Sequence, residues 1–173
     1  MRRLPLITAS LAASLLVASP VSTGLTTHDF DSPADEFRLK VVRPVLKGLD
    51  KWSCELESLL VATAAHESHL GRLSKNVFQI TEIAADELRR TTPDRFDEPA
   101  NRWHTFTQVS AAATIYLRSI RHTGGGVKET IPATSREAAF LWKRVYNTPA
   151  GKGTVRKFIR DAEREGVKWC RQQ

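Results

Sequence analysis

One carboxylate, Glu67, lies between two histidines in the stretch AHESHLG, within a segment that is otherwise mostly apolar. A helix over residues 53–70 would place Glu67 on one stripe with Leu56 and Leu60, because these residues are separated by three or four positions. An ionised carboxylate on a core-facing stripe loses hydration, so its pKa rises. We therefore expect Glu67 to act as a general acid. The alternative is a glutamate at a helix end that reaches water or pairs with Arg72.

The two histidines do not form a recognisable metal motif. His66 and His69 are three residues apart, whereas the two histidines of the H-E-x-x-H zinc motif are four apart. No cysteine pair or nearby third ligand completes a tetrahedral site. We expect no metal, with the histidines at a cleft rim or facing solvent. We also expect no cofactor, since the glycines at 124–126 follow no strand and precede no Gly-Lys-Ser/Thr sequence.

Helical periodicity dominates the rest of the chain, so we predict an all-α fold, or nearly so. Apolar residues recur at spacings of three and four over most of the predicted helices. Thr134 and Glu137 match a capping box, which predicts a helix start before the YNTPAGKG segment. The predicted helices cover residues 34–49, 53–70, 81–90, 99–120, 134–146 and 154–170.

The first predicted helix should bury Phe37, Val41, Val45 and Leu49, and Pro44 should kink or split it. Between the second and third helices, the segment NVFQI is predicted to be a short extended or loop segment. Asn76 in this segment tolerates left-handed backbone better than most residues.

The N-terminus begins with two arginines, followed by an apolar stretch and then small residues, which is typical of a secretory signal. The apolar stretch is shorter than the ~20 residues that span a bilayer. We expect residues 1–22 to be a signal-like or anchor segment, 23–33 a linker and 34–173 one folded domain. The mature protein should then contain no stable membrane span.

The chain carries a formal net charge of +7, which favours an anionic partner such as a cell-wall polymer, an acidic membrane surface or nucleic acid. No aromatic-basic ladder of the kind found in nucleic-acid modules is present, so nucleic acid is not the expected partner. The sequence indicates no oligomeric state.

Three segments together resemble the lytic transglycosylase branch of the lysozyme-like superfamily, particularly its phage-associated members. They are AAHESHLG, then NVFQI with TEIAADEL, and finally AFLWKRVYNTPAGKGTVRKFI. The resemblance covers about residues 50–165. It implies a lysozyme-like helical domain whose catalytic helix ends at the cleft. It also implies cleavage of the MurNAc-GlcNAc bond of peptidoglycan glycan strands, leaving 1,6-anhydromuramyl ends.

In this resemblance Glu67 is the single catalytic acid and base. Ser68 would help to fix it, Gln79 would contact the sugar, and Tyr146 with Asn147 would orient Glu67 or the N-acetyl group. Each has a plainer alternative: Ser68 and Gln79 could bond only backbone, and Tyr146 could be a core aromatic. The protein would be exported to the periplasm or cell envelope, or belong to a phage virion.

Two other functions remain open: a hydrolytic muramidase and a catalytically silent wall-binding or virion structural protein. A muramidase would more often use a second carboxylate, for which Glu82 and Asp86 are candidates. Acids in the first turns of a helix usually face water, so we expect these two to be solvated. Cys54 and Cys170 could be separate buried thiols, but a closing helix that returns to the start of the domain, as in this type of fold, implies a disulfide.

Overall fold

The computed structural model describes residues 30–122, 131–146 and 152–170. Helices account for the regular structure of these ranges, with no strand among them, so the predicted all-α class is confirmed. No helix in the described ranges is both long enough and apolar enough to cross a bilayer.

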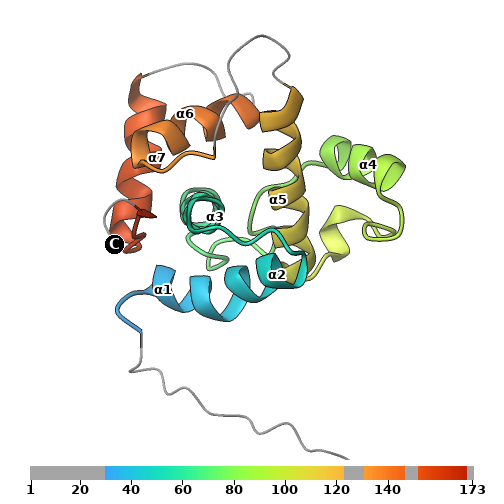
Figure 1. Ribbon diagram of the computed structural model, residues 1–173, viewed down its shortest axis with the longest axis horizontal. Coiled ribbons are helices and arrows are strands. Elements are labelled where there is room, and N and C mark those ends of the chain that lie inside the picture. The colour runs from blue at the N-terminus through green and yellow to red at the C-terminus, as the bar shows by residue number, and fades with distance from the viewer. Residues whose placement is uncertain (1–29, 123–130, 147–151, 171–173) are drawn as a thin grey trace, which may run out of the picture.

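The central element is α3 (Cys54–Ser68), which Figure 1 shows almost end-on with the other helices around it. The Oγ of Ser53 caps its first turn by accepting the N–H of Leu56 at 3.1 Å. Every residue from Leu56 to Ala65 is buried, so α3 has no solvent face. The sequence analysis predicted that one stripe of this helix faces the core, whereas the core surrounds the whole helix here. The helix is enclosed on all sides over these turns.

One continuous helical stretch packs along one side of α3 and contains α1 (Pro33–Phe37), the π-helical turn η1 (Arg38–Val42) and α2 (Arg43–Gly48). The N–H of Arg43 reaches back five residues to the carbonyl of Arg38, just before Pro44, which has no N–H to offer.

This π-helical turn corrects the predicted buried face of the first helix. An extra residue within the turn shifts the register, so Val42 and Leu46 are fully buried after Phe37. The predicted Val41, Val45 and Leu49 are only partly buried. The periodicity argument assumed an uninterrupted α-helix, which the π turn breaks.

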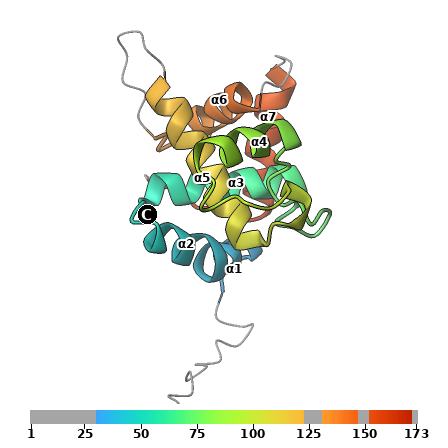
Figure 2. The same ribbon diagram turned by 90° about the vertical axis from the view of Figure 1, so that its right-hand side faces the viewer.

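The remaining helices enclose α3 from other directions (Figures 1 and 2). α4 (Glu82–Thr91) lies beyond α5 (Thr105–His122), and α6 (Ser135–Val145) lies above α3 with α7 (Lys152–Arg164) beside it. The capping box at Thr134 is present, as predicted. The predicted helix at 99–120 starts later than expected, because a separate 3₁₀ turn, η2 (Ala100–Arg102), precedes α5.

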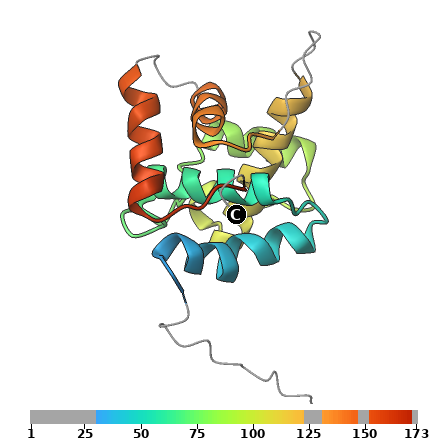
Figure 3. The same cartoon turned by 60° about the vertical axis from the view of Figure 1, so that its left-hand side comes forward.

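The last helix also ends earlier than predicted. α7 stops at Arg164, and Gly166 turns the chain with a φ of +79°. Figure 3 shows the following segment running back along α3. There Cys170 forms a disulfide with Cys54, with Cα atoms 5.8 Å apart. The structure therefore contains the expected bridge between the start of the central helix and the chain end.

Candidate active site at the end of the central helix

Glu67 lies in the last turn of α3, half-buried, and its carboxylate meets α6. The indole Nε1 of Trp142 donates a hydrogen bond to Oε1 of Glu67 at 2.7 Å. An indole N–H can only donate, so Oε1 remains an acceptor whether or not the carboxyl group is ionised. Oε2 has no described partner, so it is the oxygen from which Glu67 can give a proton to a ligand.

Burial raises the pKa of Glu67 above its usual range, while the hydrogen bond from Trp142 and the charge of Lys157 partly oppose that rise. The sequence analysis expected burial to raise the pKa of Glu67, and the burial seen in the structure acts in that direction. Arg72, the alternative partner in the sequence analysis, pairs instead with Glu165 of the segment after α7. Glu67 is therefore a partly desolvated acid with one neutral donor.

Ser68 does not contact Glu67 through any described hydrogen bond. Its hydroxyl lies 3.2 Å from the carbonyl of Ala64 and 2.8 Å from that of Val77, and it accepts the N–H of Gly71 at 2.8 Å. These bonds join the end of α3 to the loop that follows. Ser68 thus shapes the loop next to the acid.

The loop after α3 contains three consecutive residues with positive φ, His69 (51°), Leu70 (61°) and Gly71 (88°). Asn76, which tolerates left-handed backbone, does not adopt it here, whereas Gln79 does, with a φ of 49°. The Asn76 side chain holds the turn closed by pairing with both the N–H and the carbonyl of Ile80, at 3.0 and 2.9 Å.

Gln79 is exposed, and its Nε2 donates to the carbonyl of Asn76 at 3.0 Å. This is the plainer alternative of the sequence analysis, a bond to loop backbone. The amide is nevertheless on the surface, where a ligand could exchange for that bond.

Tyr146 connects this loop to α6. Its hydroxyl donates to the carbonyl of Phe78 at 2.7 Å, and its ring stacks on Trp142 with centroids 6.0 Å apart. Burial raises the pKa of Tyr146 well above its usual value, and the nearby Tyr116 and Glu67 reinforce the rise. The hydroxyl therefore stays a neutral donor at physiological pH. Asn147 lies outside the described residues.

The three segments singled out in the sequence converge through these contacts. The end of α3 meets α6 at Glu67 and Trp142, and the NVFQI loop meets α6 at Phe78 and Tyr146. Segments separated by 75 and 68 residues are thus in direct contact around one carboxylate.

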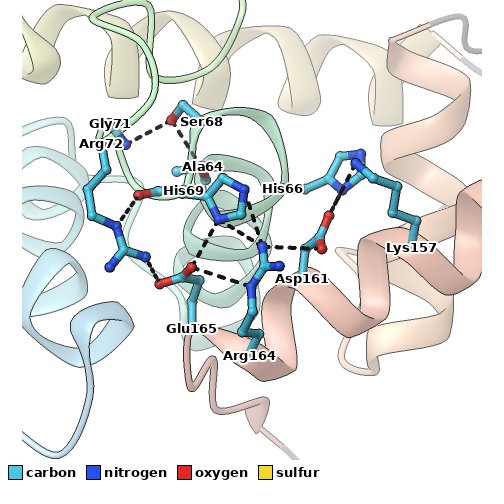
Figure 4. Close-up of polar contacts among 10 residues, drawn as sticks. All are labelled: Ala64, His66, Ser68, His69, Gly71, Arg72, Lys157, Asp161, Arg164 and Glu165. Carbon is cyan, nitrogen blue, oxygen red and sulfur yellow. Dashed lines mark hydrogen bonds and ion pairs between the residues drawn. The ribbon is translucent and has the colours of Figure 1, made fainter.

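The histidines differ from expectation. His66 is largely buried and pairs through Nδ1 with Asp161 of α7 at 2.8 Å. His69 pairs with Glu165 at 3.2 Å and contacts Arg164, as Figure 4 shows. The prediction that both line a cleft rim or face solvent was wrong for His66, because two buried carboxylates attract the imidazoles. No group of three or more metal-ligating side chains occurs among the described residues.

The two candidate second carboxylates lie on α4 and are engaged by Arg89. Glu82 is the first residue of that helix, with Oε2 3.5 Å from Arg89, and Asp86 pairs with the same guanidinium. Both side chains are more than half exposed. This is the solvated position expected of acids near a helix start.

A hollow of about 500 Å³ lies between the start of α5, η1 and the loop after α3. Its lining includes Leu70, Ser74, Lys75, Trp103 and Phe106, but not Glu67. Trp142, Gln79 and Tyr146 do not line it either.

The sequence analysis did not single out Trp142 as a functional residue. A buried indole N–H needs an acceptor, so a tryptophan on a core-facing helix predicts a polar partner. Asp161 and Lys157 were missed too, because their proximity to α3 depends on how α7 folds back.

No protein-family model, curated protein or solved structure matches the chain.

Proposed function

We propose that the protein cleaves the MurNAc-GlcNAc bond of peptidoglycan, with Glu67 as the only acid and base. The observation that carries the proposal is Glu67 itself: a half-buried carboxyl group with a raised pKa, one oxygen held by Trp142 and the other without a described partner. A raised pKa lets a carboxyl group keep its proton at a higher pH than an exposed glutamate does, and glycosidic cleavage requires a proton donor of this kind.

The reaction would proceed in two proton transfers. Protonated Glu67 gives its proton from Oε2 to the glycosidic oxygen as the C1–O bond breaks. The resulting carboxylate then takes the proton of the muramyl 6-hydroxyl while O6 bonds to C1. Glu67 is regenerated, no water is consumed and the product ends in a 1,6-anhydro ring. Trp142 stabilises the carboxylate formed between the two transfers.

Glu82 and Asp86, the two candidate second carboxylates, are more than half exposed and engaged by Arg89, and this route requires no nucleophile from the protein. The muramyl 6-hydroxyl is held by the sugar itself at high effective concentration. The exposed Gln79 would contact the glycan from the loop, and Tyr146 would hold that loop in place through the Phe78 carbonyl. Asn147 keeps its proposed role, with Tyr146, of orienting Glu67 or the N-acetyl group.

Export of the protein to the periplasm or cell envelope, or its place in a phage virion, forms part of the proposal. The Cys54–Cys170 disulfide supports an oxidising destination. The net charge of +7 suits an anionic wall.

A catalytically silent wall-binding protein is the second candidate. One observation favours it: the hollow of about 500 Å³ is not lined by Glu67. A protein that used this hollow would bind without needing the acid.

Digestion of purified peptidoglycan separates these functions. We expect clearing in a wall zymogram for the wild-type protein and none for Glu67→Gln, which keeps the acceptor for Trp142 but cannot hold the proton. Mass spectrometry should find muramyl ends about 18 Da lighter than the hydrolytic product, because no water is added. Retained lysis by Glu67→Gln would refute the acid assignment.

Glu82→Gln and Asp86→Asn are the matched controls, since each removes one solvated carboxylate. Both should keep most of the rate. Reducing muramic ends together with loss of activity in either control would indicate a two-carboxylate muramidase.

A further inference from the structure

Besides Glu67 of α3, the acid Asp161 of α7 is almost fully buried beside the end of α3. Its Oδ2 lies 2.8 Å from Nδ1 of His66. A carboxylate only accepts hydrogen bonds, so Nδ1 carries the proton and the ring orientation is set. Figure 4 shows this contact together with Lys157, whose ammonium is 3.4 Å from the same oxygen.

The fixed imidazole lies edge-on against Trp142. The ring centroids are 4.5 Å apart, with an interplanar angle of 76°. Phe158 stacks on the same indole at 5.1 Å and also contacts His66 at 5.5 Å. The indole that donates to Glu67 therefore contacts three aromatic rings, those of His66, Phe158 and Tyr146. Of these three, His66 is the one with a charged partner, Asp161.

We propose that Asp161 and His66 are positioning residues for Glu67, acting through Trp142. Asp161 fixes the imidazole, the imidazole fixes the indole, and the indole N–H keeps Oε1 of Glu67 occupied so that Oε2 faces the substrate. The effect of Asp161 and His66 on catalysis rests on the proposed function. Their effect on the Trp142 indole does not depend on it.

The neighbouring charges supply an internal control. Glu165, one helical turn after Asp161, is equally buried and pairs with the other histidine, His69. Arg164 lies between the two acids, 3.4 Å from Asp161 and 3.8 Å from Glu165. No ring contact joins His69 to Trp142 among those described, so Glu165 repeats the burial and charge of Asp161 without its connection to the indole.

The experiment compares Asp161→Asn with Glu165→Gln in the full-length chain. The Nε1–H resonance of Trp142, identified by its loss in Trp142→Phe, reports its hydrogen bond. In wild type this proton should be protected from exchange and should shift as Glu67 titrates. We expect exchange to be roughly tenfold faster or more in Asp161→Asn, and close to wild type in Glu165→Gln. Thermal unfolding of both variants separates this effect from general loss of stability.

Wall lysis provides the second measurement. Asp161→Asn should lower kcat by about tenfold with KM nearly unchanged, while Glu165→Gln keeps both. If the wild-type protein does not lyse walls, the proposed function fails, but the indole comparison still decides the positioning role. Equal Trp142 protection in the two variants would overturn the inference. Should Asp161→Asn not fold, His66→Phe against His69→Phe provides the same comparison.

Discussion

Two features of the surroundings of Glu67 have opposite effects on its pKa. Burial disfavours the carboxylate, whereas the Trp142 N–H and the charge of Lys157 favour it. The balance is a raised pKa, so ionised Glu67 lowers the free energy of unfolding at neutral pH. A residue of this kind is kept for chemistry or regulation more readily than for stability.

The pH dependence of stability tests this balance. For a carboxyl group whose pKa is higher in the folded state, the destabilisation is fully present above the folded pKa and disappears below the unfolded pKa. Glu67→Gln is uncharged at every pH and keeps the acceptor for Trp142. Its Tm should therefore exceed that of wild type at pH 7.5, and the difference should vanish near pH 4. A difference independent of pH would contradict the raised pKa.

Tyr146 gives a second test at a single atom. Tyr146→Phe keeps the ring against Trp142 but removes the donor to the Phe78 carbonyl, which is buried. An unpaired buried carbonyl costs about 1–3 kcal/mol, measurable by urea unfolding. Lysis should also fall, since the loop carrying Gln79 loses its tie to α6.

Tyr116→Phe is the control for that variant. Thr63 donates to the carbonyl of Leu59 at 2.8 Å, so the Tyr116 hydroxyl donates to Thr63 and not to the loop. Loss of stability without loss of lysis is expected. An equal loss of lysis in both variants would argue against a specific role of the Tyr146 bond.

At the scale of elements, the end of α7 depends on one glycine. Gly166 has a left-handed backbone, and a Cβ there would lie 2.5 Å from Cβ of Ser32, the residue that caps α1. Gly166→Ala combines the left-handed cost of about 1–2 kcal/mol with this overlap. We expect a loss of at least about 2 kcal/mol in urea unfolding.

Gly48→Ala is the matched substitution, because Gly48 lies in α2 and no atom outside its own helical turn lies within 4 Å of the position that a Cβ would take. It should be neutral or stabilise by up to about 1 kcal/mol. Similar effects of the two substitutions would indicate that the α7 turn is not constrained.

Helix starts marked by a capping side chain could be predicted from the sequence. Turns that depend on contacts with other parts of the fold, or that interrupt a periodic pattern, could not. The caps at Ser53, Thr81 and Thr134 are side-chain bonds within one turn, and α3, α4 and α6 begin directly after them, as expected. The turn at Gly166 packs against the distant Ser32, and the π turn before Pro44 breaks the periodicity from which the buried face of the first helix was predicted. Periodicity alone therefore extended the last helix too far.

The same division applies to the candidate site. Glu67 was found because a charge on an apolar helix is visible in sequence. Trp142, Asp161 and Lys157 approach it only after α6 and α7 fold over α3. Their spacing from Glu67 in the chain carries no information about this contact. The pairing of His66 with Asp161 could not be predicted for the same reason.

At the scale of the whole molecule, the disulfide joins the first residue of the central helix to the end of the described chain, 116 positions away. The returning segment also contributes the buried Val167 and Trp169, and the carbonyl of Lys168 accepts from Ser58 of α3 at 3.0 Å. The bridge therefore fixes a segment that already packs on the core, and through α7 it also supports the acids facing His66 and His69.

Reduction of this bridge should destabilise the protein strongly. A loop of this length lowers unfolded-chain entropy by the equivalent of about 4–5 kcal/mol. The Cys54→Ser/Cys170→Ser double variant should lose stability by about that amount, and added reductant should lower the Tm of wild type without affecting the double variant. Because α7 would then be held against α3 only by packing and by the ion pairs of Asp161 and Glu165, lysis should decline at temperatures where wild type is still active. Intact mass after alkylation checks the premise: two freely alkylated thiols in the oxidised, native protein would show that the bridge does not form.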